Sequence, residues 1–290
     1  MTDIELNEGW DWVPAPWGRG LQCRPLARVA AHVFTTRLPD LGHSTSSADP
    51  GWCQIASSLG VSAAALVRLR QIHGRTVVLV SGQDGPPPAG EAWGDGDAAV
   101  TARGDVALSV RVADCVPALV ADRTTGAVAA VHAGWRGTCA GVAVAVVESL
   151  RSVFGTDPAH LVAAIGPSIG PCCYRVGAEV EDAFTGVEAW RPHLARWVMP
   201  APARSAKRGV PGADPGTAGR PSRFLDTWTA NADQFAAAGV PRSQIHVSGL
   251  CTSCYREVFH SYRVDGPEAG RMVGAIRSTS RDQGSETGDR

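Results

Sequence analysis

The 290-residue sequence predicts an α/β (α+β) fold, because short strand-like runs and helix-like segments alternate along it. Two apolar, valine-rich runs, Val116–Ala121 and Ala127–Val131, flank the polar segment Asp122–Gly126, as in an antiparallel hairpin. Cys139–Phe154, rich in Ala, Val and Leu, is long enough for a helix, and Thr138 is its expected N-cap. Strand and helix candidates alternate in both halves of the chain, so the mixed class applies to the whole sequence.

The remaining elements are predicted from β-branched content, helical spacing and turn residues. The first 28 residues hold three tryptophans among prolines and glycines, which fits either a first strand pair or a flexible lead-in packed on the body. Near the end of the chain, a strand, a helix and a further strand predict a βαβ-like unit. The expected strands are Ala31–Thr36, Arg75–Val80, Val106–Val112, Leu161–Ile165, Phe224–Asp226 and Ile245–Ser248; the expected helices are Trp52–Leu59, 178–197 with an interruption at Pro192, and Thr227–Ala238; Ala63–Arg70 is ambiguous.

Composition limits the class of protein. A hydrophobic content of 44% and a net charge of −1 are typical of a soluble globular protein. Lys207 is the only lysine and the arginines are scattered, so no nucleic-acid surface is expected. No apolar run approaches the roughly 20 residues that span a bilayer, so we expect no membrane partner and a cytoplasmic protein. Eight cysteines are too sparse for a disulfide scaffold, which makes core residues or ligands the expected roles.

Three side chains are candidate metal ligands. In the predicted hairpin, Cys115 and His132 meet at the same open end, with Cβ atoms on the order of 5 Å apart. His73 lies at the mouth of the strand Arg75–Val80. His73, Cys115 and His132 would give a zinc ion three ligands and leave a fourth position open, which is typical of catalytic zinc. A lone buried His or Cys is more often a core residue, so spacing alone leaves both interpretations open.

A nucleophilic cysteine is the competing interpretation of the same residues. Cys115 beside His132 or His73 would form a reactive thiolate–base pair. A cysteine hydrolase normally orients its base with Asn or Asp, and Asp114 could serve as that group. Two histidines and one thiolate make a better metal cage, so the metal interpretation is preferred without being decided.

An anion site is predicted directly after His132. Gly134, Arg136, Gly137 and Thr138 combine free amides at a helix start with a guanidinium group. Such a combination binds phosphate. A metal site and an anion site would therefore be neighbours.

Four further cysteines have spacings that can carry chemistry. Cys251 and Cys254 have the CxxC spacing of a redox pair or of half a zinc knuckle, but the chain has no second CxxC. Cys172 and Cys173 are adjacent in a Gly-Pro-rich loop. Packing is the preferred interpretation for all four.

Five motifs resemble one known family. They are Arg70–Gly74 (RQIHG), Ala113–Pro117 (ADCVP), Val131–Thr138 (VHAGWRGT), Ile165–Gly177 (IGPSIGPCCYRVG) and 261–272 (SYRVDG…GRM). Over Ala31–Ile276 the chain resembles the YfiH-like family, long labelled polyphenol oxidase or laccase domain. Its members are described as zinc-dependent purine nucleoside phosphorylases that also deaminate adenosine.

The resemblance implies a fold, a site and a reaction. The fold would be a single layered domain of mixed β-sheets flanked by helices, at 29–277, preceded by a lead-in at 1–28. Independently of the resemblance, a composition rich in Pro, Gly, Ala and Arg predicts a disordered loop at 200–222, and the polar residues 278–290 predict a disordered tail. The resemblance implies zinc ligands His73, Cys115 and His132, with copper also acceptable to these donors, and Arg136 beside the substrate or phosphate. Asp114 is the nearest acid–base candidate in the sequence.

The expected partners are a purine nucleoside and phosphate. Adenosine, inosine, guanosine or 5′-methylthioadenosine would give the base and ribose 1-phosphate, and adenosine would also give inosine. A monomer or weak homodimer is expected.

The laccase label can be tested by counting. Multicopper oxidation needs about ten imidazole ligands, largely in His-x-His pairs. The chain has eight histidines and no His-x-His, so a multicopper site is excluded. A cysteine hydrolase, a single-copper phenol oxidase and a non-catalytic binding protein remain as alternatives.

Overall fold

Strands β8 (Val116–Asp122) and β9 (Val128–Ala133) form the predicted hairpin at the centre of the fold. The computed structural model describes residues 4–39, 41, 49–82, 91–201, 203 and 223–279. Every residue of β8 and β9 is buried, because both faces of their sheet are covered. This double coverage explains why both runs are apolar throughout.

The hairpin belongs to the second of two six-stranded sheets. The first sheet has the order β1 (Trp10–Ala15), β2 (Gly18–Cys23), β3 (Ala30–Phe34), β15 (Met272–Ser278), β7 (Ala107–Val112) and β4 (Leu66–Arg68). The second has the order β14 (Ile245–Val247), β10 (Leu161–Ile165), β8, β9, β6 (Ala98–Thr101) and β5 (Val77–Leu79). A small third sheet contains β11 (Arg175–Val176), β13 (Arg223–Leu225) and β12 (Val198–Met199).

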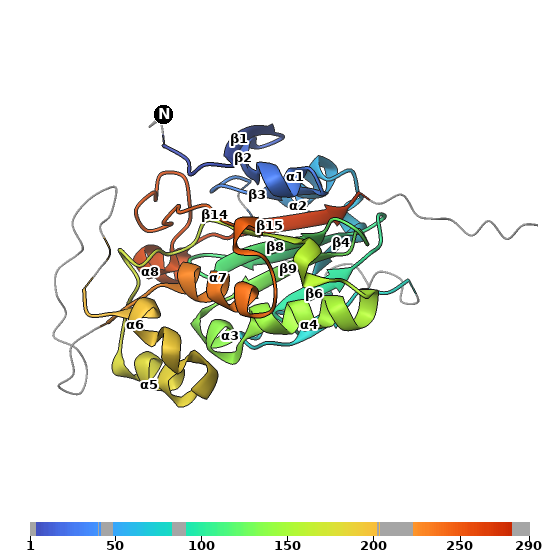
Figure 1. Ribbon diagram of the computed structural model, residues 1–290. Coiled ribbons are helices and arrows are strands. Elements are labelled where there is room, and N and C mark those ends of the chain that lie inside the picture. The colour runs from blue at the N-terminus through green and yellow to red at the C-terminus, as the bar shows by residue number, and fades with distance from the viewer. Residues whose placement is uncertain are drawn as a thin grey trace, which may run out of the picture.

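The sheets and helices form layers (Figure 1). Apolar side chains from the facing sides of the two large sheets, such as Leu108 and Leu119, share one core cluster. Helix α2 (Pro50–Ser58) covers the outer face of the first sheet through Trp52. Helices α4 (Val142–Phe154) and α7 (Thr227–Ala237) cover the second. This single-domain α+β arrangement confirms the predicted fold class.

The shorter helices lie around this body. They are α1 (Arg24–Ala27), α3 (Trp135–Ala140), α5 (Ala178–Gly186), α6 (Leu194–Trp197) and α8 (Tyr262–Asp265). The predicted interruption at Pro192 is confirmed, because a 3₁₀ helix at Glu188–His193 separates α5 from α6. The ambiguous segment Ala63–Arg70 contains a 3₁₀ turn followed by β4.

The predicted start of the central helix is wrong. Gly134 is the N-cap, and α3 begins at Trp135, so Thr138 lies inside the helix. The Thr138 hydroxyl accepts a hydrogen bond from Asn231 Nδ2 at 3.0 Å and is therefore used in tertiary packing. Gly141, at φ 82°, then separates α3 from α4, because only a glycine adopts this left-handed conformation at little cost.

Three other expectations concern the ends of the chain. Of the two alternatives for the first 28 residues, the structure shows the strand pair, because residues 10–23 form β1 and β2 within the first sheet. The predicted βαβ-like unit is wrong, since β13 and β14 lie in different sheets and β14 pairs in parallel with β10. Most of the loop at 200–222 and of the tail at 278–290 lies outside the described residues, although Ser278 itself ends β15.

Candidate metal centre and adjoining cavities

The hairpin register brings Cys115 and His132 to one end of the second sheet. Val116 pairs with Ala133, and Pro117 pairs with His132. Because side chains alternate along a strand, Cys115 and His132 point to the same face as diagonal neighbours. In this register Cys115 lies two residues away from the position directly facing His132, where the sequence predicts it. Gly134 leaves room beside Cys115: a Cβ there would lie 3.1 Å from Cys115 Sγ and 3.3 Å from His73 Cδ2.

His73 completes the group. It adopts φ 59°, a left-handed conformation that is uncommon for a residue with a side chain. Its ring centroid lies 4.9 Å from that of His132, with the two rings nearly perpendicular. The ligand atoms of His73, Cys115 and His132 all lie within 4.8 Å of one another. The structure thus brings together the three predicted side chains, which we call the His-Cys-His cluster.

Asp97, which is not among the predicted site residues, orients this cluster. Its fully buried carboxylate contacts His132 Nδ1 at 2.8 Å and accepts hydrogen bonds from the amides of His73 (2.9 Å) and Gly74 (2.6 Å). A carboxylate on Nδ1 fixes the imidazole so that Nε2 is available to a cation. The available signal was an acidic residue directly before β6, the strand that pairs with both β5 and β9.

In the His-Cys-His cluster, charges and hydrogen bonds together outweigh the effect of burial on each pKa. Burial alone would raise the pKa of Cys115, but the charge of His132 and hydrogen bonds from both histidines lower it to about 6. Burial alone would lower the pKa of His132, but Cys115 and Asp97 raise it to about 9. Burial would also raise the pKa of Asp97, yet the bond from His132 and the two amides hold it below its ordinary value. At neutral pH the metal-free cluster therefore holds a thiolate and a carboxylate around a protonated His132, and a cation that binds there would displace the proton from His132 Nε2.

Asp114 lies beside Cys115 but points its carboxylate elsewhere. It adopts φ 83° and accepts hydrogen bonds at 2.6 Å from the Thr252 hydroxyl and from the Arg263 amide. Burial raises its pKa, although these bonds oppose the shift. Both oxygens are engaged, which makes Asp114 a positioning residue for the bend that carries Cys115. The acid–base role expected for it stays a prediction.

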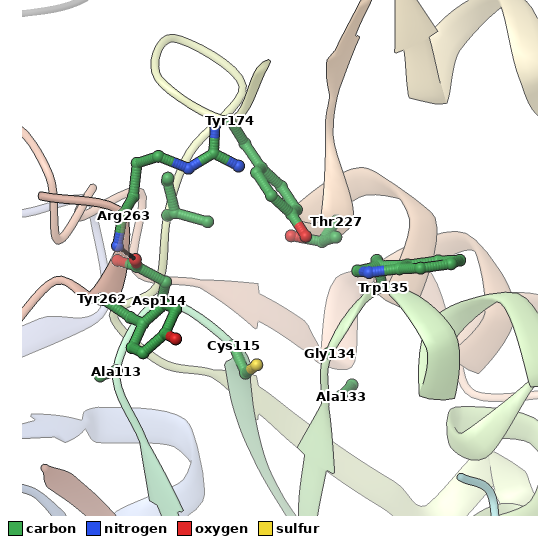
Figure 2. Close-up of a pocket in the computed structure, with 11 residues that line it drawn as sticks. Ala113, Asp114, Cys115, Ala133, Gly134, Trp135, Tyr174, Thr227, Tyr262 and Arg263 are labelled. Atoms are coloured by element: carbon green, nitrogen blue, oxygen red, sulfur yellow. Dashed lines mark hydrogen bonds between the residues drawn. The ribbon is translucent and has the colours of Figure 1, made fainter. Parts of the chain in front are cut away.

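Two cavities meet at the His-Cys-His cluster, and both are lined by Ala113, Cys115 and Tyr262. The smaller, of about 240 Å³, has apolar and aromatic walls that include Trp135, Ile169 and Tyr174. Figure 2 shows Cys115 at the base of this cavity. The larger, of about 520 Å³, is also lined by His73, His132, Arg70, Arg111 and Arg271. An aromatic compartment and a cationic compartment thus adjoin one group of metal-type donors.

Polar groups in the aromatic cavity are few and well placed. The Thr227 hydroxyl is buried and has no hydrogen-bond partner among the described residues. Tyr174 also lines this cavity, as Figure 2 shows. Burial raises the pKa of Tyr174, so its hydroxyl stays protonated at neutral pH, and Arg263 lies 5.4 Å from its ring centroid. A buried hydroxyl without a partner is costly unless a ligand uses it.

The four residues expected to bind phosphate do not lie together in one cavity. Gly134 lines the aromatic cavity. Arg136 is exposed, and its guanidinium lies 4.3 Å from the Trp135 ring centroid. The Thr138 amide donates to Gly134 O at 2.8 Å within α3, and Gly137 is packed so closely that a Cβ would lie 2.8 Å from Gly74 O. Of these four, Gly134 alone lines either of the two cavities.

A layered α+β domain with mixed His and Cys donors, an aspartate-oriented imidazole and two adjoining cavities has the features of a metalloenzyme. Residues 49–279 match the family described as "Multi-copper polyphenol oxidoreductase laccase". The chain belongs to this family, which includes the YfiH proteins.

Relatives and a solved structure agree with this assignment. A "Purine nucleoside phosphorylase" of Deinococcus radiodurans is 32% identical over 258 residues, covering 84% of this chain and 88% of the relative. A "Purine nucleoside phosphorylase" of Bacteroides thetaiotaomicron is 34% identical over 180 residues, covering 62% of this chain and 60% of the relative. The crystal structure of the Bacillus licheniformis hypothetical protein YfiH has a TM-score of 0.75 at 26% identity and covers 91% of this chain and 97% of that chain. Within the described residues, no helix is long and apolar enough to cross a membrane.

Proposed function

We propose that the protein is a zinc-dependent purine nucleoside phosphorylase. The observation that carries this proposal is the convergence of His73, Cys115 and His132 in the cationic cavity, with Cys115 also lining the aromatic cavity. The names of its relatives supply the reaction class. A nucleoside has an aromatic base and phosphate is an anion, so the two compartments suit the two substrates.

The donor set fits zinc. Two imidazoles and one thiolate are ligands that Zn²⁺ prefers, and three protein ligands leave a position for a substrate atom or water. Asp97 Oδ1 accepts from His132 Nδ1, which leaves Nε2 as the ligand atom. A bound Zn²⁺ would supply a Lewis acid at the edge of both cavities. Copper accepts the same donors, but eight histidines without a His-x-His pair do not fit the multicopper site that the family description names.

The aromatic cavity would bind the nucleoside. The rings of Trp135 and Tyr174 offer flat apolar surfaces for a purine. The Thr227 hydroxyl would satisfy its hydrogen-bonding capacity on a polar edge of the base or on the ribose. These groups orient the glycosidic bond without taking part in bond making.

The cationic cavity would bind phosphate. Burial, then repulsion from Arg271 and Arg68, lowers the pKa of Arg111, so an anion between Arg111 and Arg271 would relieve that repulsion. A phosphate oxygen would bond to the ribose C1′ as the bond from C1′ to the purine nitrogen breaks. The electron pair would remain on the purine, which takes up a proton, and ribose 1-phosphate would be released. Arg136 lines neither cavity, and its predicted contact with phosphate or substrate remains a proposal.

Adenosine deamination would use the same nucleoside site. Water would add at C6 of the purine and ammonia would leave, giving inosine. The mixed His and Cys donors of the cluster suit this reaction, because zinc nucleobase deaminases use such donors. In this proposal, deamination and phosphorolysis act on the nucleoside bound in the same orientation.

A cysteine hydrolase is the second candidate. Cys115, His132 and Asp97 form a Cys–His–Asp array in which the thiol pKa is lowered to about 6. Iodoacetamide treatment separates the two functions. A nucleophilic thiolate would be alkylated with loss of activity and no loss of metal, whereas a zinc ligand would be protected until the metal is removed.

The decisive experiment identifies products by mass after incubating the zinc-loaded protein with adenosine, with and without phosphate. We expect adenine and ribose 1-phosphate only with phosphate, and inosine in both cases. His132→Ala should abolish both reactions, while Cys53→Ser, at an exposed cysteine, should leave them unchanged. Hydrolysis to free ribose, or no turnover of any nucleoside, would refute phosphorolysis.

A further inference from the structure

Four cysteines outside the His-Cys-His cluster converge in the fold. Cys172 and Cys173 lie in the loop after β10, and Cys251 and Cys254 lie in the turn after β14, about 80 residues further along the chain. Their sulfur atoms all lie within 4.8 Å of one another. Cys254 Sγ is 3.5 Å from both Cys172 Sγ and Cys173 Sγ. We call this group the four-cysteine cluster.

Backbone contacts hold the two segments in this arrangement. The Gly170 amide points at Cys251 Sγ at 3.2 Å, and the Thr252 amide donates to Ser168 O at 3.1 Å. Tight turns present the sulfurs, since the Cys254 amide bonds Cys251 O at 3.1 Å. An amide directed at sulfur stabilises a thiolate rather than a thiol. Backbone hydrogen bonds therefore fix the positions of the two cysteine-bearing segments relative to each other.

The sulfur spacing suits one tetrahedral ion. Four sulfurs at about 2.3 Å from one zinc are separated from each other by about 3.8 Å, close to the 3.5 Å between Cys254 Sγ and each of Cys172 Sγ and Cys173 Sγ. A disulfide needs sulfurs about 2.0 Å apart and joins only two of the four. In an iron–sulfur cluster the inorganic core holds the thiolates further apart, so a group within 4.8 Å favours a single ion.

We propose that Cys172, Cys173, Cys251 and Cys254 bind one structural Zn²⁺. Binding displaces the four thiol protons, and four protein ligands leave no open position. Cys172 and Cys251 are 6% and 3% exposed, which shields the ion from exchange. This site does not depend on the proposed reaction.

The ion would fix one wall of the aromatic cavity. The loop it clamps carries Ile169 and Tyr174, which line that cavity. The Ile169 amide donates to Asp114 O at 2.9 Å, and Thr252, between the two ligands of the turn, donates to the Asp114 carboxylate. Because Asp114 directly precedes Cys115, the two clusters are joined through one residue.

The test measures metal content per chain by mass spectrometry of elements, using protein expressed with added zinc. The Cys115→Ser variant, which disables the His-Cys-His cluster, should retain one zinc per chain. Cys251→Ser combined with Cys254→Ser should lose one zinc relative to the parent chain, and Cys53→Ser should lose none. Absence of metal from the Cys115→Ser variant would overturn the proposal while leaving the proposed function intact.

Cobalt substitution gives a readout that needs no variant in the four-cysteine cluster. In the Cys115→Ser background, bound Co²⁺ should show the intense sulfur-to-metal absorption of four thiolates. Weak absorption with no such band would contradict a four-thiolate site. An intact mass lower by four hydrogens, with the four thiols resistant to alkylation until reduced, would show two disulfides and also overturn the proposal.

Discussion

The His-Cys-His cluster and the four-cysteine cluster lie on either side of Asp114 and differ in what surrounds them. The first has three donors of two kinds and opens into two cavities. The second has four sulfurs packed against Ile169 and Trp228. A cation with three protein ligands can take a substrate atom, whereas one with four cannot. The number of donors thus separates a site suited to reaction from a site suited to stability.

The largest effect should follow loss of one donor at the open site. Cys115→Ser should lower kcat/KM for adenosine phosphorolysis by at least about a thousandfold, because the hydroxyl is a poor zinc ligand. Cys254→Ser should lower kcat/KM by about tenfold or less but should clearly lower the midpoint of thermal unfolding. Steady-state kinetics and thermal scans of both variants test the comparison. Equal losses of activity would show that the two clusters do not divide reaction and stability.

The next effect concerns the group that orients the open site. Asp97→Asn should weaken zinc binding and lower activity by about 10- to 100-fold, because the amide cannot hold His132 Nδ1–H as a carboxylate does. Zinc affinity measured by competition with a chelator distinguishes this positioning role from general destabilisation. Asp105→Asn, at an exposed carboxylate paired with Arg103, is the matched control and should change neither quantity. Full zinc affinity in Asp97→Asn would contradict the assigned role.

A smaller effect distinguishes the two candidate phosphate contacts. Arg111→Ala should raise KM for phosphate by about tenfold and leave KM for adenosine nearly unchanged, since one charge-assisted hydrogen bond is lost from the cationic cavity. Arg136→Ala should have a much smaller effect, because its guanidinium is exposed over Trp135. The reverse order would place phosphate at the start of α3, as the sequence alone predicts.

Local patterns in the sequence predicted the central strands of the second sheet well. Leu161–Ile165 forms β10 with the predicted bounds, and Val116–Ala121 is all but one residue of β8. Apolar and β-branched content is read over neighbouring residues, so such strands can be found without knowing their partners. The start of α3 was missed because Gly134 caps it without a side-chain hydrogen bond, and Thr138 resembles a cap more closely.

Contacts between distant residues could not be read in this way. Asp97 lies 35 residues from His132, and Cys172 lies 82 residues from Cys254. Their proximity depends on strand order and on the path of loops, which no local pattern specifies. His73, Cys115 and His132 were predicted together only because the hairpin supplied two of them and a resemblance supported the third.

The smallest predicted effect concerns His32, a buried histidine without charged partners, whose pKa shifts in the opposite direction to that of His132. The ring of His32 in β3 has hydrogen bonds only with backbone groups, accepting from the Cys23 amide at 3.0 Å, and burial lowers its pKa to about 4. Since an unfolded histidine titrates near 6.5, stability is complete above that pH and falls as pH drops from 6.5 toward 4. Between pH 7.5 and 5.5 the loss from His32 should be about 1.4 kcal/mol. Urea unfolding of the parent chain and of His32→Gln measures it, because the variant should lack this share of the pH dependence. If the unfolding free energy of His32→Gln depended on pH as strongly as that of the parent chain, His32 would not be held neutral in the folded protein. Burial alone would then not explain the difference between the pKa values of His32 and His132.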